Sequence, residues 1–153
     1  MEFKLTSPAF SNGSQIPSRY TCDGENINPH LIIHGIPANT KSLALVVEDP
    51  DAPAGLYTHW VLWNIPPETK EIREHTAPWG SEEGYNSGNE RGYEGPCPPS
   101  GTHGYVFRLF ALDLKLKIPA DSDRQALETA MAQHILATTE LMGNYSRTNE
   151  APL

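Results

Sequence analysis

The sequence predicts a mainly β protein in which short strands are joined by many turns and a single amphipathic helix lies near the C-terminus. Three observations lead to this prediction. The 153 residues include 14 prolines and 12 glycines, and proline is excluded from helix interiors and central strands, which argues against a helical bundle. Twelve of the prolines lie before residue 100, where apolar runs of strand length end at them. The long stretch with helical apolar spacing comes after these prolines.

The first two predicted strands are apolar runs that stop at prolines. Residues 42–48 form one run, and the following sequence Asp49-Pro50-Asp51-Ala52-Pro53 cannot continue in a sheet, which places both carboxylates at a strand end. Residues 58–65 form the other, before Pro66 and Pro67. Alternation assigns its residues to two faces: His59, Val61, Trp63 and Ile65 on one, Trp60, Leu62 and Asn64 on the other. Both faces are largely apolar, so we expect a central strand.

A long irregular segment separates these strands from the next one. Residues 78–104 contain seven glycines and four prolines, and a loop of this length inside a domain is usually functional or disordered. The prolines of residues 95–101 stiffen its end and argue against disorder there. The following residues, 103–113, predict a long strand whose alternation places His103, Tyr105, Phe107 and Leu109 on one face.

The helix is predicted to run from Ser122 to Gly143. Ser122 and Gln125 have the spacing of a capping box, and Gly143 is suited to a C-terminal cap. Between them, apolar residues recur at three- and four-residue intervals. His134 falls on the apolar face and is expected to be a hydrogen-bonded core residue. The three tryptophans, Trp60, Trp63 and Trp79, are expected to pack in the interior.

Charge and hydropathy restrict the partners. Eleven basic and nineteen acidic residues give a net charge of −8, which disfavours nucleic acid and anionic membrane surfaces as partners. The first residues contain no apolar run of signal-peptide length, and no later stretch is long enough for a membrane span. With Met1 as the native start, we expect one domain over residues 1–153, located in the cytoplasm and not in a membrane.

The two cysteines are too few for a disulfide scaffold. Cys22 and Cys97 lack Cys-x-x-Cys spacing, so reduced thiols are the expectation, with a bond between the two left open.

Polar side chains that could bind a ligand or take part in catalysis lie where the predicted apolar strands meet proline- and glycine-rich turns. Asp49 and Asp51 follow one strand, His59 begins another, and His103 and Tyr105 begin a third. Each alone has a structural explanation: Asp-Pro pairs form turns, and strand histidines are usually hydrogen-bonded core residues. Together, two imidazoles, a phenol and a carboxylate form a donor set suited to a phosphate monoester or a zwitterionic head group.

Two enzymatic alternatives use the same region. Asp49, His59 and His103 could provide a facial triad for iron or three ligands for catalytic zinc, as in a metal-dependent hydrolase or lyase. Cys97 could act as a nucleophile with His103 as its base, although its position between prolines offers nothing to lower the thiol pKa.

Several motifs, in order along the chain, resemble the phosphatidylethanolamine-binding protein family. They are Asp49-Pro50-Asp51-Ala52-Pro53, His59-Trp60 and the segment from Gly95 to Tyr105. Residues 20–26, 40–45 and 141–146 also resemble the bacterial and archaeal branch of this family, the Raf kinase inhibitor-like proteins.

The resemblance implies an antiparallel two-sheet β-sandwich with Greek-key features and peripheral helices. It also implies a non-enzymatic binding protein that needs no cofactor and has a small surface pocket for an anion such as phosphate or a phosphoethanolamine-like group. Residue by residue, that pocket uses Asp49, His59, His103 and Tyr105, with Pro53, Pro98 and Pro99 shaping its rim. Less specifically, the resemblance implies a protein partner such as a kinase, and a homodimer.

One departure from the family pattern falls beside the expected pocket. The family usually has an arginine between the second pocket histidine and the tyrosine, whereas this chain has Gly104. Alternation places residue 104 on the face opposite His103, so we expect the pocket floor to be preserved and Asp51 to lack a cationic partner.

Overall fold

The computed structural model describes residues 1–147, and it consists of two antiparallel sheets and one short α-helix. Residues 148–153 of the predicted domain lie outside the described part. The small sheet has the strand order β1-β2-β5, and the large sheet has the order β6-β4-β3-β7-β8. Their bounds are β1 (Lys4–Thr6), β2 (Leu31–His34), β3 (Ser42–Asp49), β4 (Tyr57–Ile65), β5 (Glu71–Ile72), β6 (Glu82–Glu83), β7 (His103–Leu112) and β8 (Ile135–Tyr145). The helices are η1 (Ser18–Tyr20), a 3₁₀ turn, and α1 (Arg124–Met131).

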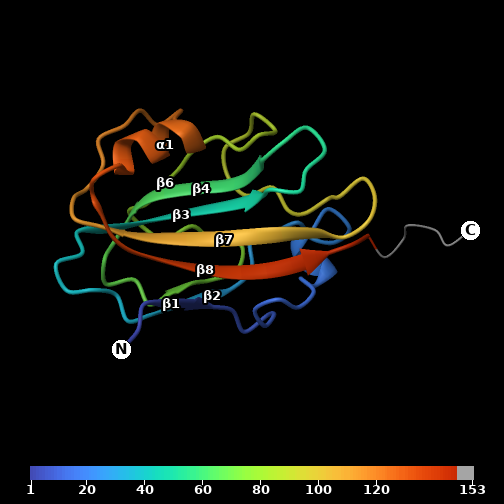
Figure 1. Cartoon of the computed structure of the whole chain (residues 1–153), viewed down its shortest axis with the longest axis horizontal. Coiled ribbons are helices and arrows are strands. Elements are labelled where there is room, and N and C mark those ends of the chain that lie inside the picture. The colour runs from blue at the N-terminus through green and yellow to red at the C-terminus, as the bar shows by residue number, and fades with distance from the viewer. Residues whose placement is uncertain (148–153) are drawn as a thin grey trace, which may run out of the picture.

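The large sheet is covered on both faces, as Figure 1 shows, with β1 and β2 on one side and α1 on the other. The main core lies between the two sheets and joins apolar residues of β1, β2 and β5 to those of β3, β4 and β7. A second, smaller core lies between the large sheet and α1, where Leu127 and Met131 are buried. The predicted mainly β, two-sheet architecture is confirmed.

Strand β3 lies at the centre of the large sheet and is buried along its whole length. Strand β4 pairs with one side of β3, and a long connection returns the chain so that β7 pairs with the other side. Because both pairings are antiparallel, the end of β3 meets the starts of β4 and β7. Asp49 is paired with Tyr57, and Glu48 is paired with Val106. This Greek-key-like return brings three predicted site segments to one end of the sheet.

The predicted faces of β4 are correct from Trp60 to Trp63 and wrong at both ends. The register with β3 shifts beside His59, which lies on the pocket side with Tyr105 and not with Val61 and Trp63. Val61 and Trp63 belong to the core beneath α1, but Ile65 belongs to the inter-sheet core with Trp60 and Leu62. Asn64 has a positive φ of 55°, and the register with β3 shifts at this point. Such an irregularity adds a residue to one strand and reverses the alternation after it.

The predicted long helix is also wrong in extent. Helix α1 has eight residues, and its N-cap is Asp123, whose side chain accepts a hydrogen bond from Ala126 N. Ser122, the predicted cap, is buried and accepts from Tyr85 N through its backbone carbonyl. The helix stops before Gln133, whose φ is 72°.

The remainder of the predicted helix is strand β8, which pairs with β7 from Ile135 to Tyr145. Gly143 is a strand residue and not a cap. A Cβ at this position would lie 2.6 Å from Cγ1 of Ile16 and 2.8 Å from Cε2 of Phe10. The glycine therefore allows the N-terminal segment to pack directly on β8.

Two further expectations about packing are corrected. His134 is not in the core, because it lies just before β8 with its side chain 41% exposed and its Nδ1 bonded to Asp113. Trp79 is 93% exposed, whereas Trp60 and Trp63 are buried as predicted. Among the described residues, no helix is long and apolar enough to cross a membrane.

Candidate functional site

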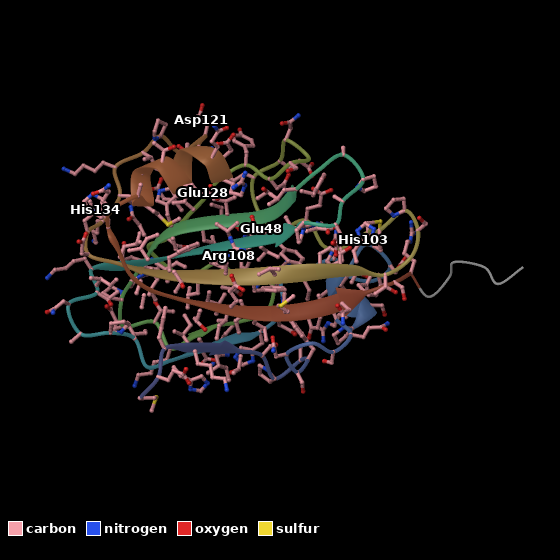
Figure 2. The ribbon with its side chains drawn as sticks, in the orientation of Figure 1. Glu48, His103, Arg108, Asp121, Glu128 and His134 are labelled. Atoms are coloured by element: carbon pink, nitrogen blue, oxygen red, sulfur yellow. A yellow bond between two sulfur atoms is a disulfide. The ribbon has the colours of Figure 1, made fainter. Side chains whose placement is uncertain are left out.

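A pocket of about 250 Å³ lies where β3 ends and where β4 and β7 begin. This is small compared with typical ligand pockets of 300–1,000 Å³, and it is suited to a ligand of a few heavy atoms. All seven residues predicted for the site line it: Asp49, Pro53, His59, Pro98, Pro99, His103 and Tyr105. Figure 2 places His103 at one end of the molecule, with His134 at the opposite end.

Asp49 and His103 are joined at the floor of this pocket. Nδ1 of His103 lies 2.6 Å from Oδ2 of Asp49, and the two residues are 9% and 3% exposed. Because a carboxylate accepts hydrogen bonds, Nδ1 carries the proton. The ring nitrogen that this bond leaves for a ligand is Nε2. The other Asp49 oxygen, Oδ1, accepts from the backbone N–H of Asp51 at 2.7 Å, which fixes the carboxylate in turn.

His59 is held in the same manner by a different acceptor. Its Nδ1 lies 2.6 Å from the carbonyl oxygen of Glu94. A carbonyl can only accept, so the proton again resides on Nδ1, and Nε2 is the remaining nitrogen. Burial lowers the pKa of His59 because it disfavours the charged imidazolium, while the Glu94 carbonyl and the nearby carboxylates oppose this effect.

Two tyrosines flank the His59 ring. The Tyr105 ring packs edge-on against it at 5.3 Å between centroids, and the Tyr57 ring lies 4.9 Å away. Burial raises the pKa of Tyr105, and Asp49 and Asp51 raise it further. Burial and the hydrogen bond to Glu94 raise the pKa of Tyr57 to about 12. Both phenols therefore stay protonated at neutral pH and can act as hydrogen-bond donors.

Cys97 lies on the pocket wall, and its sulfur is bonded to Cys22. The expectation of reduced thiols is therefore wrong, and the described residues include no free cysteine. A sulfur in a disulfide is not a thiolate, so this structure does not provide the nucleophile that the Cys97–His103 alternative requires. The pairing was missed because the two residues are 75 positions apart, and separation in sequence does not indicate a contact.

Sequence reasoning also missed Tyr57 and Glu94. Tyr57 is two residues before His59 on β4, so alternation could have placed both on one face. Glu94 lies in the long loop, and it uses its carbonyl for His59 and its carboxylate for Tyr57. Every residue has a carbonyl, so the sequence carries no signal for the first of these roles.

Asp51 lies outside the pocket and has a different partner from the one usual in the family pattern. Its Oδ2 accepts a hydrogen bond from the backbone N–H of Gly104 at 3.1 Å. The Asp51 carboxylate is thus bonded by the main-chain N–H of residue 104, the position at which the family pattern has an arginine. Within residues 1–147, no group of three or more His, Cys, Asp and Glu side chains is arranged to hold a metal ion.

Known proteins resemble this chain over most of its length. A family model described as phosphatidylethanolamine-binding protein matches residues 6–146. The UPF0098 protein of Methanothermobacter thermautotrophicus is 47% identical over 148 residues, which cover 94% of this chain and 98% of that protein.

Two solved structures share the fold. CT736 from Chlamydia trachomatis, described as a phosphatidylethanolamine-binding protein homologue, superposes with a TM-score of 0.92 at 41% identity over 95% of this chain and 97% of that one. Escherichia coli YbcL, described as a member of the mammalian PEBP family, gives a TM-score of 0.90 at 30% identity, over 97% and 100% of the two chains.

Proposed function

Because the chain belongs to the phosphatidylethanolamine-binding protein family, we propose that it is a non-enzymatic binding protein whose pocket takes a small anionic group. The ligand class is a phosphate monoester, either alone or as part of a phosphoethanolamine-like head group. Binding residues are Asp49, His59, His103 and Tyr105, and Pro53, Pro98 and Pro99 form the rim.

The observation that carries this proposal is the matched orientation of the two imidazoles. Each histidine uses Nδ1 to bond a protein acceptor, which leaves Nε2 of His59 and of His103 for a ligand. A protonated imidazole donates from Nε2 to a phosphate oxygen, and a neutral one accepts from a protonated phosphate. Tyr105 adds a phenolic donor on the same wall.

The carboxylates of the pocket favour a zwitterionic ligand over a simple anion. Asp49 and Glu94 both line the pocket, and they repel a dianion such as free phosphate. An ammonium group attached to the phosphate would be attracted to them. We therefore expect phosphoethanolamine to bind more tightly than inorganic phosphate.

Isothermal titration tests the site. Phosphoethanolamine should bind the wild type with 1:1 stoichiometry, and His59→Ala and His103→Ala should each weaken binding by about tenfold or more, the loss of a charge-assisted hydrogen bond. His134→Ala is the matched control, because this histidine lies at the opposite end of the molecule (Figure 2). Binding that is unchanged in both pocket variants would overturn the assignment.

The family resemblance implies two narrower predictions, a protein partner such as a kinase and a homodimer. A phosphorylated side chain of a protein partner presents the same monoester as the head group, which is the chemical basis for a kinase or another phosphoprotein as partner. The homodimer is tested by sedimentation analysis of the chain at several concentrations. The cytoplasmic location also stays a prediction, and the disulfide weighs against it, since such bonds are rare in reducing compartments.

A further inference from the structure

The disulfide joins the wall of the pocket to a separate part of the chain. Cys97 lies in residues 95–102, here called the rim segment, which includes the pocket residues Pro98 and Pro99. Cys22 lies in residues 18–26, here called the anchor segment. The Cα atoms of the two cysteines are 5.4 Å apart across 75 positions of sequence.

The anchor segment is itself fastened to the large sheet. Asp23, next to Cys22, accepts a hydrogen bond from the phenol of Tyr145 at 2.5 Å and another from Arg147 Nη2 at 3.1 Å. Tyr145 is the last residue of β8 and is fully buried. The bond between Cys22 and Cys97 therefore connects the rim segment to a rigid part of the fold.

The rim segment has few backbone donors with which to hold itself in place. Pro96, Pro98 and Pro99 have no N–H group, so three of the four positions 96–99 cannot donate a backbone hydrogen bond. The anchor segment bonds the beginning of the rim, through Cys22 N to the Pro96 carbonyl at 3.1 Å and through Gly95 N to Asn26 Oδ1 at 2.9 Å. The disulfide is the covalent link at the point where the rim enters the pocket wall.

The same bond lies where a reductant can reach it. Cys97 is exposed and Cys22 is half-buried. A structural disulfide of a core is protected by burial, whereas an exposed one is available for exchange with an external thiolate. Cys97 therefore both forms part of the pocket wall and is accessible to a reductant.

We propose that the Cys22–Cys97 bond controls the pocket, which is competent to bind its ligand when the bond is formed and loosened when the bond is reduced. This inference rests on the proposed function and specifies its regulation. The reductant is a dithiol. One of its thiolates attacks Sγ of Cys97, which forms a mixed disulfide and releases the Cys22 thiolate, and that thiolate takes a proton.

The second thiol of the reductant completes the exchange. It attacks the mixed disulfide, which frees the Cys97 thiol and leaves the reductant as a disulfide. Two electrons and two protons pass to the protein in total. The Pro98 and Pro99 wall is then held only by the chain on either side of it and by its noncovalent contacts. If the wall occupies its binding position for a tenth of the time, the apparent Kd rises about tenfold.

The test compares one protein in two redox states. Phosphoethanolamine is titrated calorimetrically into the oxidised wild type and into the same protein after dithiothreitol treatment without denaturant, with a thiol count before and after. We expect two thiols to appear and the Kd to rise about tenfold. Failure to release thiols, or equal affinity in the two states, would overturn the proposal.

The variant Cys22→Ser provides the matched control, because it removes the bond and leaves the pocket residue Cys97 in place. Its affinity should equal that of the reduced wild type and should not respond to dithiothreitol. Amide hydrogen exchange over residues 97–105 gives a readout that needs no ligand, and exchange there should accelerate on reduction while exchange in β3 stays slow.

These measurements separate the two claims. If the oxidised wild type does not bind phosphoethanolamine or phosphate, the proposed function fails. The exchange data still test whether the Cys22–Cys97 bond holds the rim segment in place. Unchanged exchange on reduction would show that the bond does not hold the wall, and the redox proposal would be rejected even if the pocket binds its ligand.

Discussion

Nδ1 of His103 donates a hydrogen bond to Oδ2 of Asp49 across 2.6 Å, and this bond joins the start of β7 to the end of β3 inside the pocket. The two residues are 54 positions apart in sequence. The pairing of β3 with β7 ends at Glu48 and Val106, so this side-chain bond joins the two strands just beyond their last paired residues. The bond makes a strong prediction about stability as well as about binding.

Replacing Asp49 with alanine should destabilise the fold by about 2 kcal/mol, since it leaves the buried Nδ1–H of His103 without an acceptor. The Asp51 N–H loses its acceptor as well. Urea denaturation measures the change. Asp51→Ala is the matched control: its carboxylate is exposed and bonds only the Gly104 N–H among the described residues, so the loss should stay below about 1 kcal/mol. Equal losses in the two variants would contradict the role given to Asp49.

The free energy of unfolding should decrease as the pH is lowered, because of His59. Burial depresses its pKa in the folded state, so as the pH drops below the ordinary value of 6.5 the unfolded chain takes up a proton before the folded one does. The contribution is fully present above 6.5 and is lost as the pH falls toward the depressed value. Denaturant unfolding on either side of pH 6.5 measures the slope. The variant His59→Gln should reduce this slope, and a slope identical to that of the wild type would show that His59 is not responsible.

The disulfide should contribute strongly to stability, because it closes a loop of 75 positions in the unfolded chain. The chain-entropy model assigns such a loop about 4 kcal/mol. The double variant Cys22→Ser, Cys97→Ser and the reduced wild type should therefore both unfold at lower denaturant concentration than the oxidised protein. A midpoint that does not move on reduction would mean that the bond does not form in solution.

Two strand glycines should respond differently to substitution by alanine. At Gly143 the new methyl group would lie under 3.0 Å from Ile16 and Phe10, which costs about 1–3 kcal/mol of overpacking. At Gly104 the nearest atom is Oδ2 of Asp51 at 3.5 Å, an ordinary contact, so the change should stay within about 0.5 kcal/mol. Thermal unfolding of both variants measures the difference. Tolerance of alanine at Gly143 would count against the packing of the N-terminal segment on β8.

Chelation should leave ligand binding unchanged, because the proposed binding groups are imidazoles and a phenol that act directly. Phosphoethanolamine should bind the protein equally well before and after dialysis against a chelator. Metal analysis of protein purified without chelator completes the experiment. Stoichiometric zinc or iron whose removal abolishes binding would favour the alternative in which Asp49, His59 and His103 hold a metal.

Much of the central sheet could be predicted from the sequence, since β3, β4 and β7 are apolar runs whose ends are fixed locally by prolines and turns. The convergence of Asp49, His59 and His103 in one pocket follows from those strand ends. The departure of Ile65 from the predicted face could not be foreseen, because it depends on one residue, Asn64, adopting a positive φ.

The second half of the predicted helix shows why other features could not be read locally. The apolar residues of 135–145 fit a helical spacing and also occupy a strand, and the choice between the two is made by pairing with β7, a partner distant in sequence. The Cys22–Cys97 bond and the carbonyl of Glu94 beneath His59 are likewise products of the folded arrangement. Local pattern thus predicted where the site lies, and tertiary contacts determined how it is held.

The measurement that tests the central claim most directly is a crystal structure of the oxidised protein soaked with phosphoethanolamine. We predict that the phosphate group lies in the pocket within hydrogen-bonding distance of Nε2 of both His59 and His103, with the ammonium group toward Asp49 or Glu94. A ligand bound elsewhere, or an empty pocket at a ligand concentration that saturates the calorimetric titration, would contradict the account.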